Sequence, residues 1–218
     1  MAERGSQVAR TKGNAAATKD RVAEILDAST VVFGKYGYNG GSLSQIAQQL
    51  DIGESGILHH FKTKANLLAE VLKHRDSQGI ERSKLHGTDG LEFVHSWLAM
   101  IEFNIADPGN VELFCIISAE ATSPNHPAHE YFKARYQTAT KFAIDSFRSL
   151  SELGYLREDL NPEILGQSLV ALSDGLQVQW LLDRSSGMLE HHKKFFTQVL
   201  TEEAAEKIGL SANRKVLS

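Results

Sequence analysis

Two adjacent histidines, a phenylalanine and two lysines stand close together in the segment ESGILHHFKTK, residues 54–64. These residue types fit three kinds of chemistry: metal binding, acid–base catalysis by a histidine pair, or contact with a negatively charged partner. Adjacent residues of a helix point about 100° apart, so His59 and His60 cannot chelate one metal ion. Imidazole and ammonium groups can hydrogen-bond to base edges and pair with phosphates, which favours a polyanion as the partner.

Two further histidine pairs are weaker candidates for a functional site. His126 and His129 are three residues apart beside Glu130, which is geometrically closer to a metal-ligand pair. No third ligand is near in sequence, so we interpret them as a surface feature at the start of a helix. His191 and His192 adjoin two lysines, a pattern typical of a solvated helix face.

A helical hydrolase is the alternative that would make the chain an enzyme. It would use Ser118 or Cys115 as nucleophile with His95 or His126 as base, but only the residue types support it. The chain has no nucleophile elbow, paired-carboxylate spacing, phosphate loop or metal motif. We therefore expect no catalytic residue, no metal and no cofactor.

Composition describes an ordinary globular protein. Hydrophobic residues make up 42% and charged residues 23% of the 218 residues, enough chain for one or two domains. The single cysteine, Cys115, lies in the apolar run ELFCIISAE, which suits a buried thiol in a reducing compartment. The N-terminus lacks the apolar core of a signal peptide, and no run reaches the roughly 18 apolar residues of a membrane helix. We expect a cytoplasmic protein without a membrane partner.

Charge is unevenly distributed along the chain. Residues 1–75 carry ten lysines and arginines against seven acidic residues, whereas residues 76–218 carry thirteen against twenty. A weakly basic first third on an acidic remainder favours a polyanion-binding N-terminal end.

Helical periodicity recurs throughout, and strand signals are nearly absent. A helix starts near Thr18, and Gly37 supplies the left-handed residue that ends such helices. Ser42 and Gln45 form a capping box that opens a short second helix, and a third runs over 54–60. Two such short helices are stable only when packed together, which predicts a helix-turn-helix. Further helices are expected from Thr63 to about residue 84, before a glycine-punctuated turn, and over 89–106, 108–122, 127–153, 162–184 and 189–208.

The third helix is expected to be the outermost of the pair, with Ile57 as its inward anchor. Small residues at its start allow close approach to another surface, and a helix of this kind docks in the DNA major groove. Lysines beside it can pair with phosphates, and the start of the following helix adds free N–H groups. The predicted DNA-binding residues are Ser42, Ser44, Gln45, Glu54, Ser55, Gly56, His59, His60, Lys62 and Lys64.

At this point the sequence resembles the TetR-type transcriptional regulators. The resemblance runs over residues 18–72, with Tyr36-Gly37-Tyr38, the Ser42 cap, Ile46-Ala47 and the stretch HHFKTKANLL in the family's order. Phe61 and Lys64 fall where the family places its closing phenylalanine and a phosphate-contacting lysine. The segment GYLREDLNPEILGQSLVALSDGLQVQWLLD resembles the region before the family's dimerisation helices.

Four residues depart from the family pattern. Asp51 replaces a glycine in the turn, and Gly53 replaces the usual serine or threonine at the start of the third helix. Leu58 stands where many members have a tyrosine that touches the phosphate backbone, and Glu54 puts a carboxylate near the DNA face. These two keep open a second hypothesis, an effector-binding helical scaffold with weakened DNA binding.

The resemblance also implies a small-molecule cavity among the middle helices. Aromatic and sulfur-containing side chains there would be taken singly as core, and buried polar groups need partners, of which a ligand is one. The predicted pocket residues are Trp97, Met100, Phe103, Asn104, Phe114, Ser118, Tyr136, Asp174 and Gln177.

The resulting hypothesis is an all-α, non-enzymatic DNA-binding transcriptional regulator of about nine helices. We expect a flexible tail over 1–17, a helix-turn-helix domain over 18–64, and an effector-binding and dimerisation domain over 65–218. Helices 162–184 and 189–208 are expected to pair with their symmetry mates in a homodimer. Its partners would be a palindromic double-stranded operator and an unidentified small-molecule effector that releases the repressor.

Overall fold

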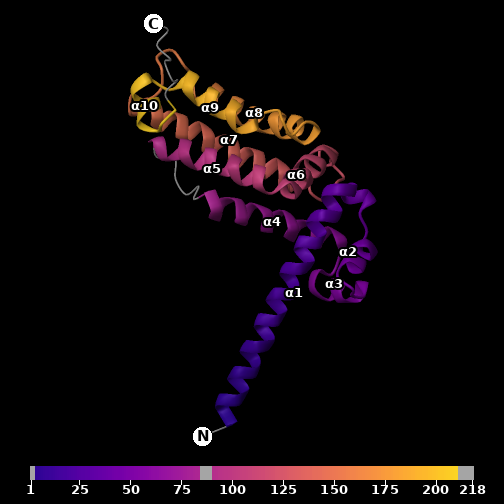
Figure 1. Ribbon diagram of the computed structural model, residues 1–218. Helices are drawn as coiled ribbons and strands as arrows, with labels where there is room; N and C mark the ends of the chain where they lie inside the picture. The colour runs from indigo at the N-terminus through magenta and orange to yellow at the C-terminus, as the bar shows by residue number, and fades with distance from the viewer. Residues whose placement is uncertain (1–2, 84–89, 211–218) are drawn as a thin grey trace.

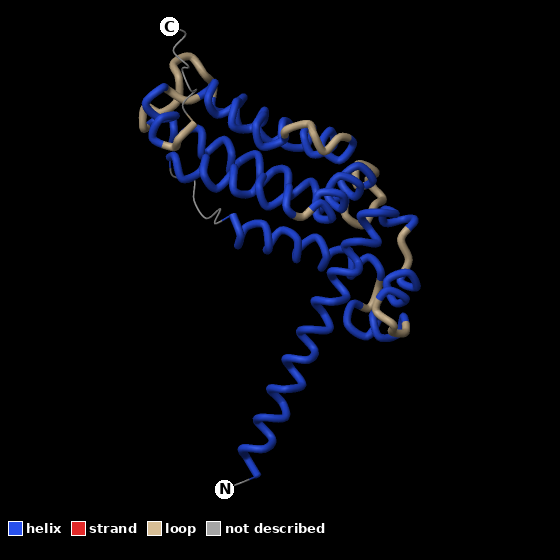
Figure 2. The backbone as a smooth tube through the Cα atoms, in the orientation of Figure 1, coloured by secondary structure: helices blue, strands red, loops and turns tan. Residues whose placement is uncertain are grey.

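The computed structural model describes residues 3–83 and 90–210, which form an all-helical fold (Figures 1 and 2). Within these residues the only β-type pairing is an isolated antiparallel bridge between Leu156 and Leu200. The predicted all-α fold class is confirmed. The helices are α1 (Glu3–Gly40), α2 (Leu43–Gln49), α3 (Glu54–Phe61), α4 (Lys64–Ser83), α5 (Gly90–Ala106), α6 (Pro108–Glu120), α7 (His129–Glu152), α8 (Pro162–Leu182), α9 (Met188–Val199) and α10 (Glu202–Lys207).

The helices form a small end and a larger body (Figure 1). The small end is made by α2, α3 and the second half of α1, and α4 leads from it to the body of α5 to α10. Helix α1 packs against α4 and α6, and α7 packs along α8. Gly166 permits this last approach, because a Cβ there would lie 2.6 Å from the backbone nitrogen of Ile144.

Local sequence explains the small end. Ile25, Phe33, Ile46 and Ile57 are fully buried where α1, α2 and α3 meet. The capping box at the start of α2 is complete: the Ser42 N–H donates to Gln45 Oε1 at 2.7 Å, and the Gln45 N–H donates to Ser42 Oγ at 3.2 Å. Two otherwise unpaired backbone donors are thereby satisfied, which fixes where α2 begins.

The turn between α2 and α3 uses the family departure noted above. Asp51 has a φ of +51°, in the left-handed region where glycine is the usual occupant. Gly53 occupies the cap position of α3 and offers no side-chain hydrogen bond. Thr63 caps α4, since its Oγ1 accepts the Asn66 N–H at 3.1 Å.

One hydrophobic cluster joins the small end to the body. Leu67, Leu68 and the buried residues of α1 to α3 belong to the same cluster as Leu113 and Ile117 of α6. A second cluster fills the body, where Phe93, Phe147 and Phe196 pack edge to face or stacked. The small end and the body are therefore in direct hydrophobic contact at α6.

The prediction for the N-terminus was wrong in one respect. Residues 3–17, which we assigned to a tail, continue the backbone of α1. The segment NAAATKD has no proline and is rich in alanine, the strongest helix former, so the helix pattern has no stop before Thr18. At its other end α1 bends at Gly37, with a φ of +70°, and continues to Gly40.

Two predicted boundaries in the body were also wrong. The single helix expected over 189–208 is two helices, which makes ten over the described residues rather than about nine. Leu200 is extended because the Arg157 N–H donates to Val199 O and the Thr201 N–H to Tyr155 O, both at 2.9 Å. Helix α7 begins at His129 rather than at Pro127, after a series of turns.

Two further points concern what the structure describes. The glycine-punctuated turn expected after residue 84 lies outside the described residues. Within the described residues, no helix combines the length and apolar character needed to cross a membrane.

Candidate nucleic-acid interface and ligand cavity

Helix α3 lies at the surface and turns one side outward. Ile57 and Phe61 are buried against α1 and α2, whereas Ser55, Gly56 and His59 are exposed. A Cβ at Gly56 would meet only Ile52 Cδ1, at 3.9 Å, so the space before it is open. The outward side of α3 is therefore small at its start and aromatic at its end, as expected for a helix that enters a groove.

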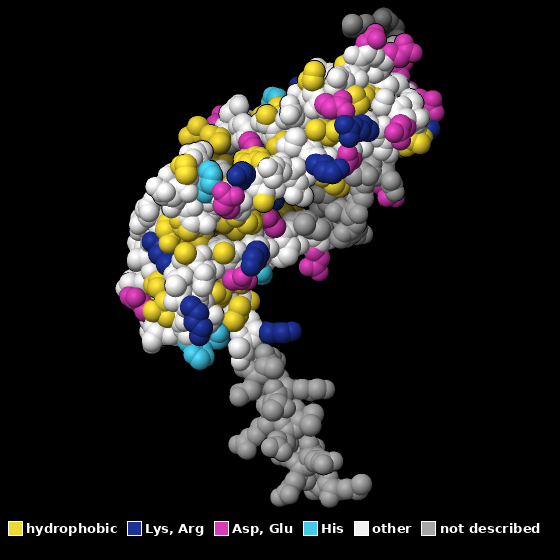
Figure 3. All heavy atoms as spheres, turned by 180° about the vertical axis from the view of Figure 1, so that it is seen from behind, with side chains coloured by type: hydrophobic (Ala, Val, Ile, Leu, Met, Phe, Trp, Pro, Cys, Tyr) yellow, Lys and Arg dark blue, Asp and Glu magenta, His cyan; other side chains and the backbone are white. Residues whose placement is uncertain are grey.

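Histidine and lysine side chains lie at the far end of α3. Figure 3 shows histidines and a basic side chain at the tip of the small end. The His59 and His60 rings stand edge to face with centroids 5.3 Å apart, and His60 is half-buried. Lys62 is exposed, ends the helix with a φ of +65°, and donates from Nζ to His59 O at 3.2 Å. The lysine chain is thereby held across the end of α3.

The predicted contacts on α2 divide into two kinds. Ser42 and Gln45 use their side-chain oxygens for the capping box, so their first role in the fold is to hold α2. Ser44, on the outer side of α2, is exposed and free of that role, as is Glu54 at the start of α3. Leu58 is 37% exposed and presents no polar group where many family members have a tyrosine.

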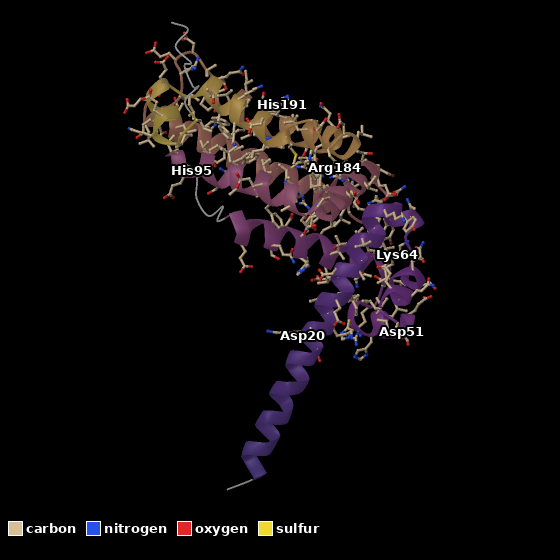
Figure 4. The ribbon with its side chains drawn as sticks, viewed as in Figure 1. Asp20, Asp51, Lys64, His95, Arg184 and His191 are labelled. Atoms are coloured by element: carbon tan, nitrogen blue, oxygen red, sulfur yellow. The ribbon has the colours of Figure 1, made fainter. Side chains whose placement is uncertain are left out.

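Lys64 differs from the others because it is half-buried. Its Nζ lies 4.5 Å from the centre of the Tyr38 ring, a cation–π contact. Partial burial lowers the pKa of Lys64, and the nearby Glu120 carboxylate opposes that shift. Figure 4 shows Lys64 nearer to the larger body than Asp51 is. This lysine thus sits at the junction of the two regions rather than at the exposed tip.

Glu120, the last residue of α6, organises that junction. Its Oε2 accepts the backbone N–H of Tyr38 at 2.7 Å and lies 3.5 Å from His126 Nε2. The positive φ of Gly37 favours glycine, and a Cβ there would come within 2.2 Å of Glu120 Oε1, so a larger residue would displace this carboxylate from the Tyr38 N–H. The body therefore holds the bend of α1 directly through one carboxylate.

A cavity of about 470 Å³ lies among α4, α5, α6, α7 and α8. Of the nine predicted pocket residues, only Ser118 is absent from its lining. Ser118 donates its hydroxyl to Cys115 O in its own helix, a bond that leaves it serving α6 rather than a ligand. The predicted residues that line the cavity are Trp97, Met100, Phe103, Asn104, Phe114, Tyr136, Asp174 and Gln177.

Sequence reasoning missed the charged wall of this cavity. Asp76 Oδ1 pairs with Arg75 Nη1 at 3.1 Å and Arg135 Nη1 at 2.9 Å, and Asp76 Oδ2 accepts the Tyr131 hydroxyl. Arg75 is 8% exposed and also donates from Nε to Asn110 O at 3.2 Å. Arginines are usually solvated, and Arg135 comes from another helix, so only the adjacent Arg75-Asp76 pair was visible in sequence.

Asp174 forms the second charged group of the cavity. Burial raises its pKa, and a hydrogen bond from Tyr136 together with the two arginines opposes that shift. Burial likewise raises the pKa of the Tyr136 hydroxyl, with Asp174 adding to it. Tyr136 and Asp174 therefore share a hydrogen bond in a weakly solvated part of the cavity.

Several residues weighed for other chemistry have structural roles. His126 and His192 are buried, not surface features as predicted: the His192 ring contacts Ser173 Oγ at 2.9 Å and Met188 O at 2.8 Å. Burial raises the pKa of Cys115 to about 11, which makes its thiol a poor nucleophile near neutral pH. No group of three or more potential metal ligands is present among the described residues.

Similarity to known proteins agrees with this arrangement. Residues 25–71 match the family described as bacterial regulatory proteins, tetR family. The chain is 22% identical over 153 residues to the HTH-type transcriptional regulator UidR of Escherichia coli K12, covering 70% of this chain and 77% of that regulator.

Solved structures share the fold. A TetR-family regulator from Agrobacterium tumefaciens has a TM-score of 0.72 at 16% identity, and a regulator from Saccharomonospora viridis in complex with choline has 0.70 at 20%. Each similarity covers 84% of this chain and 99% of the other. Residues 25–71 thus match the DNA-binding segment of the tetR family, and the whole fold is that of solved TetR-family regulators.

Proposed function

We propose that this protein is a homodimeric repressor, released from a palindromic operator by a small molecule that enters the cavity. Residues 18–64 would bind DNA, and residues 65–218 would bind the effector and form the dimer. The observation that carries the proposal is the outward side of α3, where Ser55, Gly56 and His59 are exposed on a helix anchored by buried Ile57.

In this proposal α3 enters the major groove and α2 lies across the backbone. Ser55, His59 and His60 would contact base edges, while Ser44 and Lys62 would contact phosphates. Lys64 would act mainly through the junction, since its ammonium packs on Tyr38. The capping pair of Ser42 and Gln45 would support contact by holding the backbone N–H groups of α2 in place.

A neutral face on α8 supports dimerisation there. From residue 164 to residue 182, no exposed residue of this helix is charged. Its outward side carries Ile164, Val178 and Leu182, the last 84% exposed, with small Ala171 and Gly175 between them. Small residues allow two such helices to pack closely across a two-fold axis. The two α3 helices of the dimer would then contact operator half-sites about 34–36 Å apart.

Helix α6 supports a route from cavity to DNA. It carries Phe114, which lines the cavity, and Glu120, which binds the Tyr38 N–H at the bend of α1. An effector that binds better when α6 is in one position would favour the matching position of the small end relative to the body. A mismatch with the half-sites would then lower DNA affinity by a coupling of about 1–3 kcal/mol.

Binding to the chain's own upstream DNA tests the proposal, followed by fluorescence anisotropy at several salt concentrations. We expect saturable binding of one dimer per palindromic site, and its loss in an Ala171→Glu variant that is monomeric by sedimentation. Sequence-independent binding alone, or tight binding by the monomer, would contradict it.

The hypothesis of a scaffold with weakened DNA binding remains the second candidate. Leu58 and Glu54, both exposed on α3, favour it because neither helps to bind phosphate. A Leu58→Tyr variant separates the two. If only this variant binds upstream DNA, the natural chain is the scaffold; if both bind, the repressor proposal stands.

A further inference from the structure

We infer that the cavity takes a neutral, largely apolar small molecule bearing a hydroxyl or a comparable hydrogen-bonding group, which Asn104, Trp97 and Gln177 would bind. This inference rests on the proposed function, because it names the class of effector for the same cavity. It depends on how each polar group around the cavity is already partnered.

The charges of the cavity wall are balanced without a ligand. The described lining holds two arginines and two carboxylates. Asp76 pairs with both Arg75 and Arg135, and Asp174 shares a hydrogen bond with Tyr136. A charged ligand would enter a weakly solvated space in which Asp76 and the two arginines are already paired and burial raises the pKa of Asp174, which disfavours its charged form. An unpaired buried charge is strongly unfavourable.

One aromatic ring of the lining, that of Phe114, is already in contact with two cations. The Arg75 guanidinium lies 4.5 Å and that of Arg135 5.2 Å from the centre of the Phe114 ring. A ligand cation at this wall would face two arginines. The geometry therefore disfavours an ammonium ligand at Phe114 despite the attraction of aromatic faces for cations.

The groups that lack partners are neutral. Trp97 Nε1 and Gln177 Oε1 are buried with no hydrogen-bond partner among the described residues. Asn104 is 4% exposed, and its side-chain amide makes no hydrogen bond within the described part of the chain. Trp97 and Asn104 are seven residues apart on one face of α5, and Gln177 comes from α8.

Buried polar groups usually have partners, and an unpaired one is costly. A hydroxyl can accept from an indole N–H or an amide N–H and donate to an amide oxygen. The rest of the lining is largely apolar, with Met100, Phe103, Phe142 and Val170 around the space. A ligand with an apolar body and one hydroxyl would thus pack against the apolar lining and hydrogen-bond to the unpartnered polar groups.

The test uses four probes with one phenylbutyl body: 4-phenylbutan-1-ol, its methyl ether, 4-phenylbutyrate and 4-phenylbutylammonium. Binding to the full chain is measured by isothermal titration calorimetry. We expect the alcohol to bind at least about tenfold more tightly than either ion, and more tightly than the ether, which cannot donate.

Substitutions of lining residues test whether the probe binds in the cavity. Asn104→Leu and Gln177→Met each remove an unpartnered amide at similar volume, and are expected to weaken alcohol binding about fivefold to tenfold while affecting the ether less. Trp97→Phe removes one N–H, and Trp180→Phe, a buried tryptophan outside the lining, is its matched control with unchanged affinity. Exposed Gln198→Met is the control for Gln177→Met.

The outcomes distinguish this inference from the proposed function. Tighter binding of either ion, equal binding of alcohol and ether, or no binding of the alcohol overturns the neutral-ligand inference. Anisotropy with operator DNA is then measured with the probe that binds best. If the alcohol binds as expected yet leaves DNA affinity unchanged, the ligand class stands and release by the effector fails.

Discussion

The outward side of α3 and the cavity wall both contain polar and charged groups, but the two regions hold them differently. On α3, Ser55 and His59 are exposed, and water can satisfy them before any partner arrives. In the cavity, Arg75 and Asp76 are held by several partners at once. An exposed polar or charged side chain on α3 can therefore be substituted with little effect on folding, whereas the cavity charges are part of the folded core.

Removing one carboxylate from each region should show this difference most strongly. Asp76→Ala leaves two arginines and the Tyr131 hydroxyl without their common partner, so we expect a loss of about 3 kcal/mol in the free energy of unfolding. Glu54→Ala, on α3, should change it by less than about 0.5 kcal/mol. Urea denaturation measures both, and similar values for the two would remove the distinction.

The junction between the regions gives the next largest effect. Gly37→Ala places a Cβ near Glu120 in a left-handed backbone conformation, and should destabilise by about 2 kcal/mol. Gly40→Ala is the matched control, because its Cβ would lie 3.6 Å from Tyr36 Cβ, an ordinary contact. Thermal unfolding followed by circular dichroism checks the pair, and equal melting temperatures would count against the role of Gly37.

A smaller difference is expected between two serines at the start of α2. Ser42→Ala removes the capping box and should lower the free energy of unfolding by about 1 kcal/mol. Ser44→Ala, two residues on and exposed, should leave stability nearly unchanged but weaken DNA binding if it contacts phosphate. Stability and anisotropy measured on both variants separate support of α2 from contact; a destabilising Ser44→Ala would contradict the division.

The smallest effect concerns Lys62. If its ammonium pairs with one phosphate, Lys62→Ala should reduce the slope of log affinity against log salt by about 0.9, with stability unchanged. Anisotropy titrations between low and moderate salt provide the slope. A slope equal to that of the unaltered protein would exclude a phosphate contact by Lys62.

Sequence was informative where the interactions are local. The capping box of Ser42 and Gln45, the bend at Gly37 and the inward position of Ile57 each depend on residues a few positions away. The predicted pocket residues came from the family resemblance together with the need of buried polar groups for partners. Ser118 was misplaced because a polar residue on a middle helix can find its partner within its own helix, as Ser118 does at Cys115 O.

What sequence did not show depends on partners far along the chain. Arg135 meets Asp76 across 59 residues, and the bridge of Leu156 to Leu200 breaks the last helix across 44. His192 looked solvated beside two lysines, but its ring packs against Ser173 of α8. Such pairings are set by how the helices pack, which no local pattern contains.

A Gly56→Leu variant tests most directly whether α3 enters DNA. The new side chain would project from the exposed side of a helix with only Ile52 Cδ1 near its Cβ, so folding should be unaffected or slightly favoured. With charge also unchanged, we predict that operator affinity falls to the sequence-independent level while the melting temperature is kept. Operator affinity equal to that of the unaltered protein would contradict the assignment of α3 as the reading helix.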